Sequence, residues 1–198
     1  GDEEITIKSV NGSYEISGDT VVAQHTVLVV NGSLCIHPGT EKALESYQKI
    51  VVNGSVRCPN SLEGYLAKLS INGSLSIYPD NCVLLDSTFV LDRYLPLRAR
   101  EGTRYYAEDM IVIRDQTVDL EKLSAKNVQF LTKRLLVPEN LVEKCVPLFD
   151  EQVDFAVVPD GMSLVFGDTV LDQHLAEKEG DCLYVYGSVS LSLDCDMQ

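Results

Sequence analysis

Three consecutive segments repeat one short phrase: LVVNGSLCIHP at 28–38, IVVNGSVRCP at 50–59 and LSINGSLSIYP at 69–79. An earlier copy, KSVNGSYEIS, occupies 8–17, and a degenerate copy, LYVYGSVSLSL, occupies 183–193. The glycines of the first four copies recur at nearly equal intervals, at Gly12, Gly32, Gly54 and Gly73. A period of about 20 residues is typical of solenoid proteins, in which each repeat buries its apolar face against its neighbours.

Apolar and polar positions alternate along the aligned copies. The residues two before and two after the glycine are apolar in every copy, and the residue directly after it is always serine. Strict alternation predicts extended chain with one buried face. The position three after the glycine is expected to face outward, and it holds Glu15, Cys35, Arg57, Ser76 and Ser190.

The Asn-Gly pair predicts a sharp bend, because both residue types tolerate positive φ. Asn-Gly also occurs in β-hairpins, but hairpins do not require the same apolar position to return at such a regular interval. We therefore expect a corner in a stacked coil, with an asparagine ladder along the repeats. The four NGS segments also match the N-glycosylation sequon, and we favour the bend as their explanation. The ladder would consist of Asn11, Asn31, Asn53 and Asn72.

These patterns predict a mainly β protein: a right-handed parallel β-solenoid of about 20-residue repeats with short helical turns. A leucine-rich-repeat-like α/β solenoid is the alternative. We expect one elongated domain over 1–198, since no segment is rich enough in Pro or Ser to be a linker. Its parts are an N-terminal cap at 1–25 with a second strand at 20–24, regular repeats at 26–79, and degenerate repeats with a C-terminal cap at 80–198.

Helical turns are expected in the connections 40–49 and 61–68, where apolar residues recur every three or four positions. The degenerate part retains a rhythm of strands and turns. Its expected strands are 88–92, 110–114, 128–131, 134–137, 153–158, 162–166 and 182–193, and its expected helical segments are 119–125, 138–146 and 172–180.

Two families resemble parts of the chain. The corner that recurs with this period, over residues 5–79 of a small acidic chain, resembles the bactofilins, whose β-helices stack end to end into filaments. The Asn-Gly-Ser corner and the helical connections depart from that family. The segment 58–79 is similar to leucine-rich repeats, with Leu62, Leu66, Leu69 and Ile71 in matching positions, although the expected Asn-x-Leu is out of step. Both resemblances imply binding or assembly rather than catalysis.

Composition excludes several function classes. The net charge of −14 argues against nonspecific binding to nucleic acid or anionic membranes. No apolar run approaches the roughly 20 residues of a membrane span, and no signal peptide is visible, although a leader removed before Gly1 stays open. The six cysteines lack paired short spacings and are expected to be free thiols, most of them in the core, in a cytoplasmic protein.

The segment 93–106, RYLPLRAREGTRYY, is the only stretch of this acidic chain in which basic and aromatic residues alternate closely. Arg and Tyr are enriched at interface hot spots, so we predict a partner-binding surface here. The alternative is a solvated loop whose arginines pair with carboxylates such as Asp92, Glu101, Glu108 and Asp109. The predicted partner-binding residues are Arg93, Tyr94, Arg98, Arg100, Arg104, Tyr105 and Tyr106.

Cys35 and His37 are two residues apart and could form half of a metal site. A closed zinc site needs four ligands, whereas the next copies offer Arg57, Pro59, Ser76 and Tyr78 at these positions. We therefore predict no metal site and no cofactor.

We also predict no catalytic residues. No serine or cysteine lies in a nucleophile elbow, and no phosphate-binding glycine pattern is present. The expected function is that of a noncatalytic scaffold or protein-interaction repeat protein, which binds a protein partner or itself and no nucleic acid. Self-assembly through the ends or the side of the solenoid is one form of this function. A carbohydrate-binding or carbohydrate-active β-helix protein is the alternative.

Overall fold

The computed structural model of the chain describes residues 4–166, 169–171, 183–186 and 189–191. The predicted helix at 172–180 lies outside these residues. The chain divides into two compact units, residues 1–82 and 83–198. The sequence carries no linker from which this boundary could be placed.

The first unit is built on one parallel sheet. Strands β1 (Thr6–Ile16), β2 (Thr26–Ile36), β3 (Tyr47–Pro59) and β4 (Leu69–Tyr78) lie in chain order. The pairing aligns the Asn, Gly and Ser of every copy with those of the next. The two predicted helical connections are confirmed as α1 (Glu41–Ser46) and the 3₁₀-helix η1 (Asn60–Lys68). The parallel pairing confirms that the Asn-Gly pairs are not hairpin turns.

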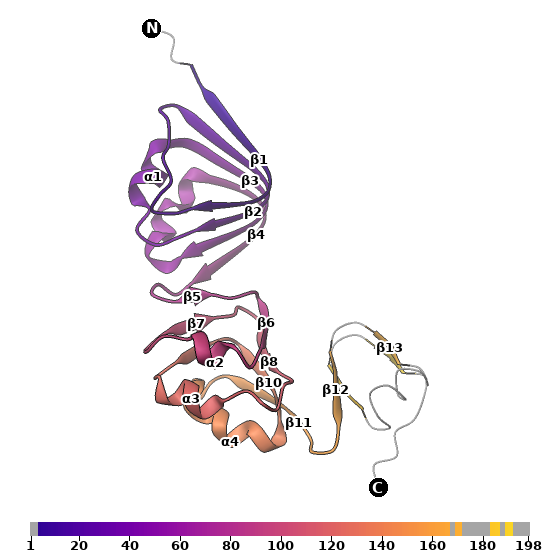
Figure 1. Ribbon diagram of the computed structural model, residues 1–198. Helices are drawn as coiled ribbons and strands as arrows, with labels where there is room; N and C mark the ends of the chain where they lie inside the picture. Colours follow the sequence, from indigo (N-terminus) through magenta and orange to yellow (C-terminus); the bar gives the residue numbers. More distant parts are fainter. Residues whose placement is uncertain (1–3, 167–168, 172–182, 187–188, 192–198) are drawn as a thin grey trace. The chain divides into compact units, whose positions relative to one another are not determined.

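Each strand of this unit bends at its glycine, and the two halves of the strands diverge from the shared corner (Figure 1). The four glycines have φ between +115° and +148°, a range that side chains disfavour. A Cβ on Gly54 would also lie 1.8 Å from the carbonyl oxygen of Gly32, and the corresponding distances to the preceding strand are 2.1 Å at Gly32 and 1.8 Å at Gly73. Glycine is therefore required at these three corners for backbone conformation and for close stacking.

The predicted asparagine ladder is confirmed. The side-chain amide of each asparagine donates to the carbonyl oxygen of the previous one: Asn31 to Asn11 at 3.1 Å, Asn53 to Asn31 at 2.8 Å, and Asn72 to Asn53 at 2.9 Å. The hydroxyl groups of Ser13 and Ser33 are also hydrogen-bonded, at 3.0 Å. These polar chains run along the outside of the corner and reinforce the register that the apolar positions set.

The core of the first unit consists of the inward residues of the strands together with apolar residues of α1 and η1. The predicted inward residues of β2 and β3 are buried, whereas those of β1 and β4, the first and last strands of this described sheet, are more exposed. Leu75 of β4 is in register with the buried Val56 and is nevertheless 44% exposed. The predicted strand at 20–24 was wrong: these residues form no strand, and Val21 is 93% exposed in the loop between β1 and β2.

The second unit contains further parallel pairs. Its largest sheet has the order β11-β10-β8-β6, with β6 (Thr88–Leu91), β8 (Met110–Ile113), β10 (Arg134–Pro138) and β11 (Asp154–Val158). A second sheet pairs β5 (Val83–Leu84), β7 (Arg104–Tyr106) and β9 (Gln129–Leu131). The remaining pairs are β12 (Ser163–Phe166) with β14 (Leu183–Tyr186), and β13 (Thr169–Leu171) with β15 (Val189–Leu191).

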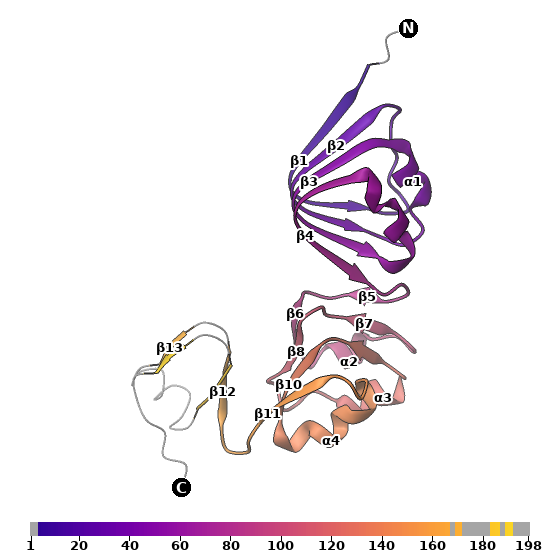
Figure 2. The ribbon, with the colours of Figure 1, turned by 180° about the vertical axis from the view of Figure 1, so that it is seen from behind.

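Short helices connect the strands of the second unit, and α2 and α3 lie on the side away from β6 and β8 (Figure 2). They are α2 (Leu95–Arg98), α3 (Leu120–Ala125), η2 (Glu139–Leu141), α4 (Val142–Cys145) and η3 (Val146–Leu148). The core contains an aromatic row in which Phe130 stacks on Tyr105 and Phe149, at 5.5 and 5.3 Å between ring centroids.

The chain is therefore mainly β with parallel sheets, as the alternation predicted. None of the helices in the described part of the chain has the length and apolar character needed to cross a bilayer.

Candidate functional site

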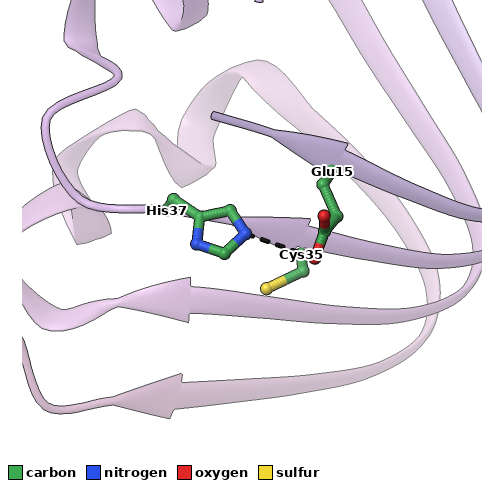
Figure 3. A group of neighbouring side chains, drawn as sticks. All are labelled: Glu15, Cys35 and His37. Carbon is green, nitrogen blue, oxygen red and sulfur yellow. Dashed lines mark hydrogen bonds and ion pairs between the residues drawn. The ribbon is translucent and has the colours of Figure 1, made fainter. Parts of the chain in front are cut away.

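Glu15, Cys35 and His37 form a cluster at the end of β1 and β2 (Figure 3). Glu15 and Cys35 are paired across the two strands, and His37 follows β2, where its backbone N–H donates to the Ile16 carbonyl at 2.9 Å. Residues 35 and 37 point to the same side because side chains alternate along an extended chain. The carboxylate, thiol and imidazole ligand atoms lie within 4.8 Å of one another, and His37 Nε2 is 3.4 Å from Glu15 Oε1.

Cys35 lies on the same side as Glu15 and Arg57 but is buried there, with 9% of its surface exposed, which the sequence did not predict. The register pairs this short side chain with Glu15 on one strand and Arg57 on the other, and these longer side chains flank it. Burial raises the pKa of the Cys35 thiol, and the positive charge of Arg57 acts in the opposite direction. The side chains of His37 and Glu15 are 35% and 68% exposed, so solvent reaches the cluster from their side.

Sequence reasoning identified Cys35 and His37 but missed Glu15 as their neighbour. It compared these residues only with the copies that follow them, where the matching positions hold Arg57 and Ser76. The preceding copy has glutamate at the same position, and the in-register pairing brings it beside Cys35. The signal was therefore present in the alignment of the repeats.

The predicted partner surface at 93–106 separates into exposed and buried residues. Arg93 and Tyr94 are exposed, and the guanidinium group of Arg93 donates to the Tyr94 hydroxyl at 2.8 Å and lies 5.0 Å from its ring centroid. Tyr105 is 7% exposed and stacks on Phe130, so it belongs to the core. Tyr106 is half-buried, whereas the other predicted contact residues are exposed, namely Arg98, Arg100 and Arg104.

Two carboxylates of the proposed solvated-loop alternative have roles in the local fold. Asp92 Oδ1 accepts hydrogen bonds from the backbone N–H groups of Tyr94 and Leu95, which fixes the start of α2. Glu101 accepts a hydrogen bond from the side-chain amide of Asn127 at 2.5 Å. These two acidic side chains order the segment through hydrogen bonds with backbone and amide groups.

Two of the clefts among the described residues are lined by charged side chains. One of about 300 Å³ lies beside Arg114, Asn140 and Asp160. Asp160 is the one carboxylate among the described residues lining it, whereas glycoside hydrolysis generally uses two. In a second cleft, beside His25 and Glu45, the Lys68 amino group donates to three backbone carbonyls and thereby fixes the end of α1.

Strand β1 presents a long open edge. It has β2 as its only partner among the described strands of its sheet. Thr6 donates its backbone N–H to the His25 carbonyl at 3.0 Å, so this group points toward β2. Backbone groups of a paired strand face its two neighbours alternately, and those of Ile7 and Ser9 therefore point to the open edge. Ile5 and Ile7 are 56% and 67% exposed.

Comparison with protein families, with curated proteins and with solved structures finds no match to the chain. The resemblances to bactofilins and to leucine-rich repeats therefore stay predictions, and the function is argued from the geometry alone.

Proposed function

We propose that the protein is a noncatalytic repeat scaffold that binds proteins and associates with further copies of itself. Its architecture in this proposal is a right-handed parallel β-solenoid with short helical turns. The open edge of β1 carries the proposal, since an unpaired strand edge is a template on which another chain can add a strand.

The shape of the corner supports addition of a strand that carries the same phrase. At Gly32, Gly54 and Gly73, the space where a Cβ would stand is filled by the carbonyl group of the preceding strand's glycine. At Gly12 nothing lies within 4 Å of that position. The first strand thus has room for one more carbonyl group of the same kind.

The asparagine ladder supports the same conclusion. The ladder ends in β1 at Asn11, whose Oδ1 accepts a hydrogen bond from the side-chain amide of Asn31. The asparagine of an added strand in register would accept a hydrogen bond from the side-chain amide of Asn11, just as Asn31 and Asn53 accept from the next asparagine of the ladder. Because the phrase recurs in this chain, including the degenerate copy at 183–193, the occupant we propose is a second copy of the protein.

Charge opposes this association and makes it dependent on salt. Two copies with a net charge of −14 repel each other, and screening weakens the repulsion at moderate ionic strength. Lys8 adds a positive charge on β1, and its amino group lies 4.9 Å from the ring centroid of Tyr14. Lysine on an edge strand limits uncontrolled pairing, so we expect reversible association rather than aggregation.

A matched pair of lysine substitutions tests this function. Ile7→Lys places a charge on the open edge, whereas Val21→Lys makes the same change on the exposed loop between β1 and β2. Light scattering coupled to size-exclusion chromatography should show a larger mass than the monomer for the parent chain and for Val21→Lys, and the monomer mass for Ile7→Lys. Equal masses for the two variants would contradict association through β1.

A further inference from the structure

We propose that Glu15, Cys35 and His37 bind one divalent transition-metal ion of the zinc type. These residues provide a carboxylate, a thiol and an imidazole from adjacent strands, and their ligand atoms lie within 4.8 Å of one another. The site shares strand β1 with the self-association proposed above, through Glu15, but it is tested by metal binding rather than by mass.

The cluster needs little rearrangement to close around an ion. Zinc bonds to sulfur, nitrogen and oxygen of about 2.0–2.3 Å in tetrahedral geometry place neighbouring ligand atoms roughly 3.3–3.7 Å apart. His37 Nε2 and Glu15 Oε1 are already 3.4 Å apart. Rotation of the Glu15 side chain, which is 68% exposed, can bring its carboxylate to an ion held by Cys35 and His37.

The type of ligand selects the class of metal. Thiolate and imidazole favour zinc and similar ions, whereas magnesium and calcium prefer oxygen ligands alone. A divalent ion bound by one thiolate and one carboxylate is neutral overall, which suits a half-buried position. Three protein ligands leave the fourth tetrahedral position to a water molecule.

Arg57 has a defined place in this proposal. It is paired with Cys35 in the register of β2 and β3, and its positive charge offsets part of the effect of burial, which raises the pKa of the Cys35 thiol. Side chains that donate hydrogen bonds to metal ligands orient those ligands and adjust the metal site. Arg57 would thus support the sulfur from β3 while the ion lies on the side of Glu15 and His37.

Cobalt(II) is the most direct test, because a thiolate bound to Co²⁺ gives a charge-transfer absorption band that zinc lacks. The full chain with reduced thiols is titrated with Co²⁺, and Zn²⁺ is then added to displace it. We expect a saturable thiolate band at one equivalent that Zn²⁺ abolishes. The band should be absent from Cys35→Ser and retained by Cys82→Ser, which removes a partly exposed thiol outside the cluster.

Substitution of the other ligands keeps the test valid if Cys35→Ser does not fold. His37→Gln and Glu15→Gln alter more exposed side chains, and His25→Gln is the control for the histidine. Removing a ligand should weaken Co²⁺ affinity by more than the roughly 10–100-fold that supporting residues contribute, while His25→Gln should leave affinity unchanged. Failure of the parent chain to give the band, or a band that survives in His37→Gln with unchanged affinity, would overturn the proposal.

Discussion

Gly54 packs against the carbonyl group of Gly32 so closely that no side chain fits between the two strands. A methyl group would lie 1.8 Å from the carbonyl oxygen, at a backbone φ of +145°. Gly12 has a φ of +115° and nothing within 4 Å. Gly12→Ala should therefore cost about 1–3 kcal/mol through backbone strain alone, and Gly54→Ala should cost clearly more.

Native-state hydrogen exchange of the amides of β2 and β3 measures both costs within the first unit. Gly18→Ala serves as the control, because a Cβ there meets nothing within 4 Å and its φ lies outside the positive range. Equal protection in Gly54→Ala and Gly12→Ala would show that close stacking at the corner contributes nothing.

The thiols should differ in reactivity. Burial raises the pKa of Cys58 to about 11 and that of Cys145 to about 12. Both thiols are buried, whereas Cys82 is partly exposed. Since the thiolate is the reactive form, alkylation near pH 8 should modify Cys82 well before Cys58 or Cys145, and raising the pH by about one unit should leave that order unchanged. Peptide mass spectrometry after timed alkylation measures each residue separately, and early modification of Cys145 would contradict its burial.

At the scale of residues, the sequence predicts a contact that recurs in every copy of the phrase better than the environment of a residue found in one copy only. The columns of the repeat predicted the asparagine ladder because every copy contributes the same side chain. They did not predict the burial of Cys35, since that depends on the longer side chains that flank one position. Of the Glu15–Cys35–His37 cluster only Cys35 and His37 were identified, because these residues were compared with the following copies and not with the preceding copy, which holds Glu15.

The asparagine ladder should stabilise the inner strands more than its ends. Asn53 donates to Asn31 and accepts from Asn72, whereas Asn11 only accepts within the described chain. With a net value near 1 kcal/mol for each hydrogen bond, Asn53→Ala should cost about 2 kcal/mol and Asn11→Ala about 1 kcal/mol. Hydrogen exchange in β2 and β3 measures the difference, and an equal cost for the two variants would mean that the ladder adds nothing beyond each residue's own turn preference.

At the scale of elements, the long strands with the phrase were predictable, and so were short strands with an apolar run of their own: β6, β8, β9, β10, β11 and β12 lie where strands were predicted. The short strands β5 and β7 of the second unit were not predicted. Strands β1 to β4 have enough alternating positions to define a period. Strands β5 and β7 contain two and three residues, and β7 lies inside the segment interpreted as a binding loop. The loop at 20–24 was mistaken for a strand because its valines suggest one locally, although no neighbouring strand pairs with it.

At the scale of the whole molecule, the period of the phrase predicted parallel stacking. In parallel strands, the same position of the phrase can lie beside its equivalent in the next strand throughout the sheet. The division into two units could not be predicted, since the strand rhythm continues across residues 82 and 83 without a change in composition.

Sedimentation velocity of the full chain tests the central claim of self-association most directly. Measurements over an about hundredfold concentration range, at low and at moderate salt, separate mass action from charge repulsion. We predict larger species that grow with concentration and are favoured at moderate salt, because screening reduces repulsion between copies of net charge −14. A single species with a concentration-independent sedimentation coefficient at both salt levels would contradict the claim.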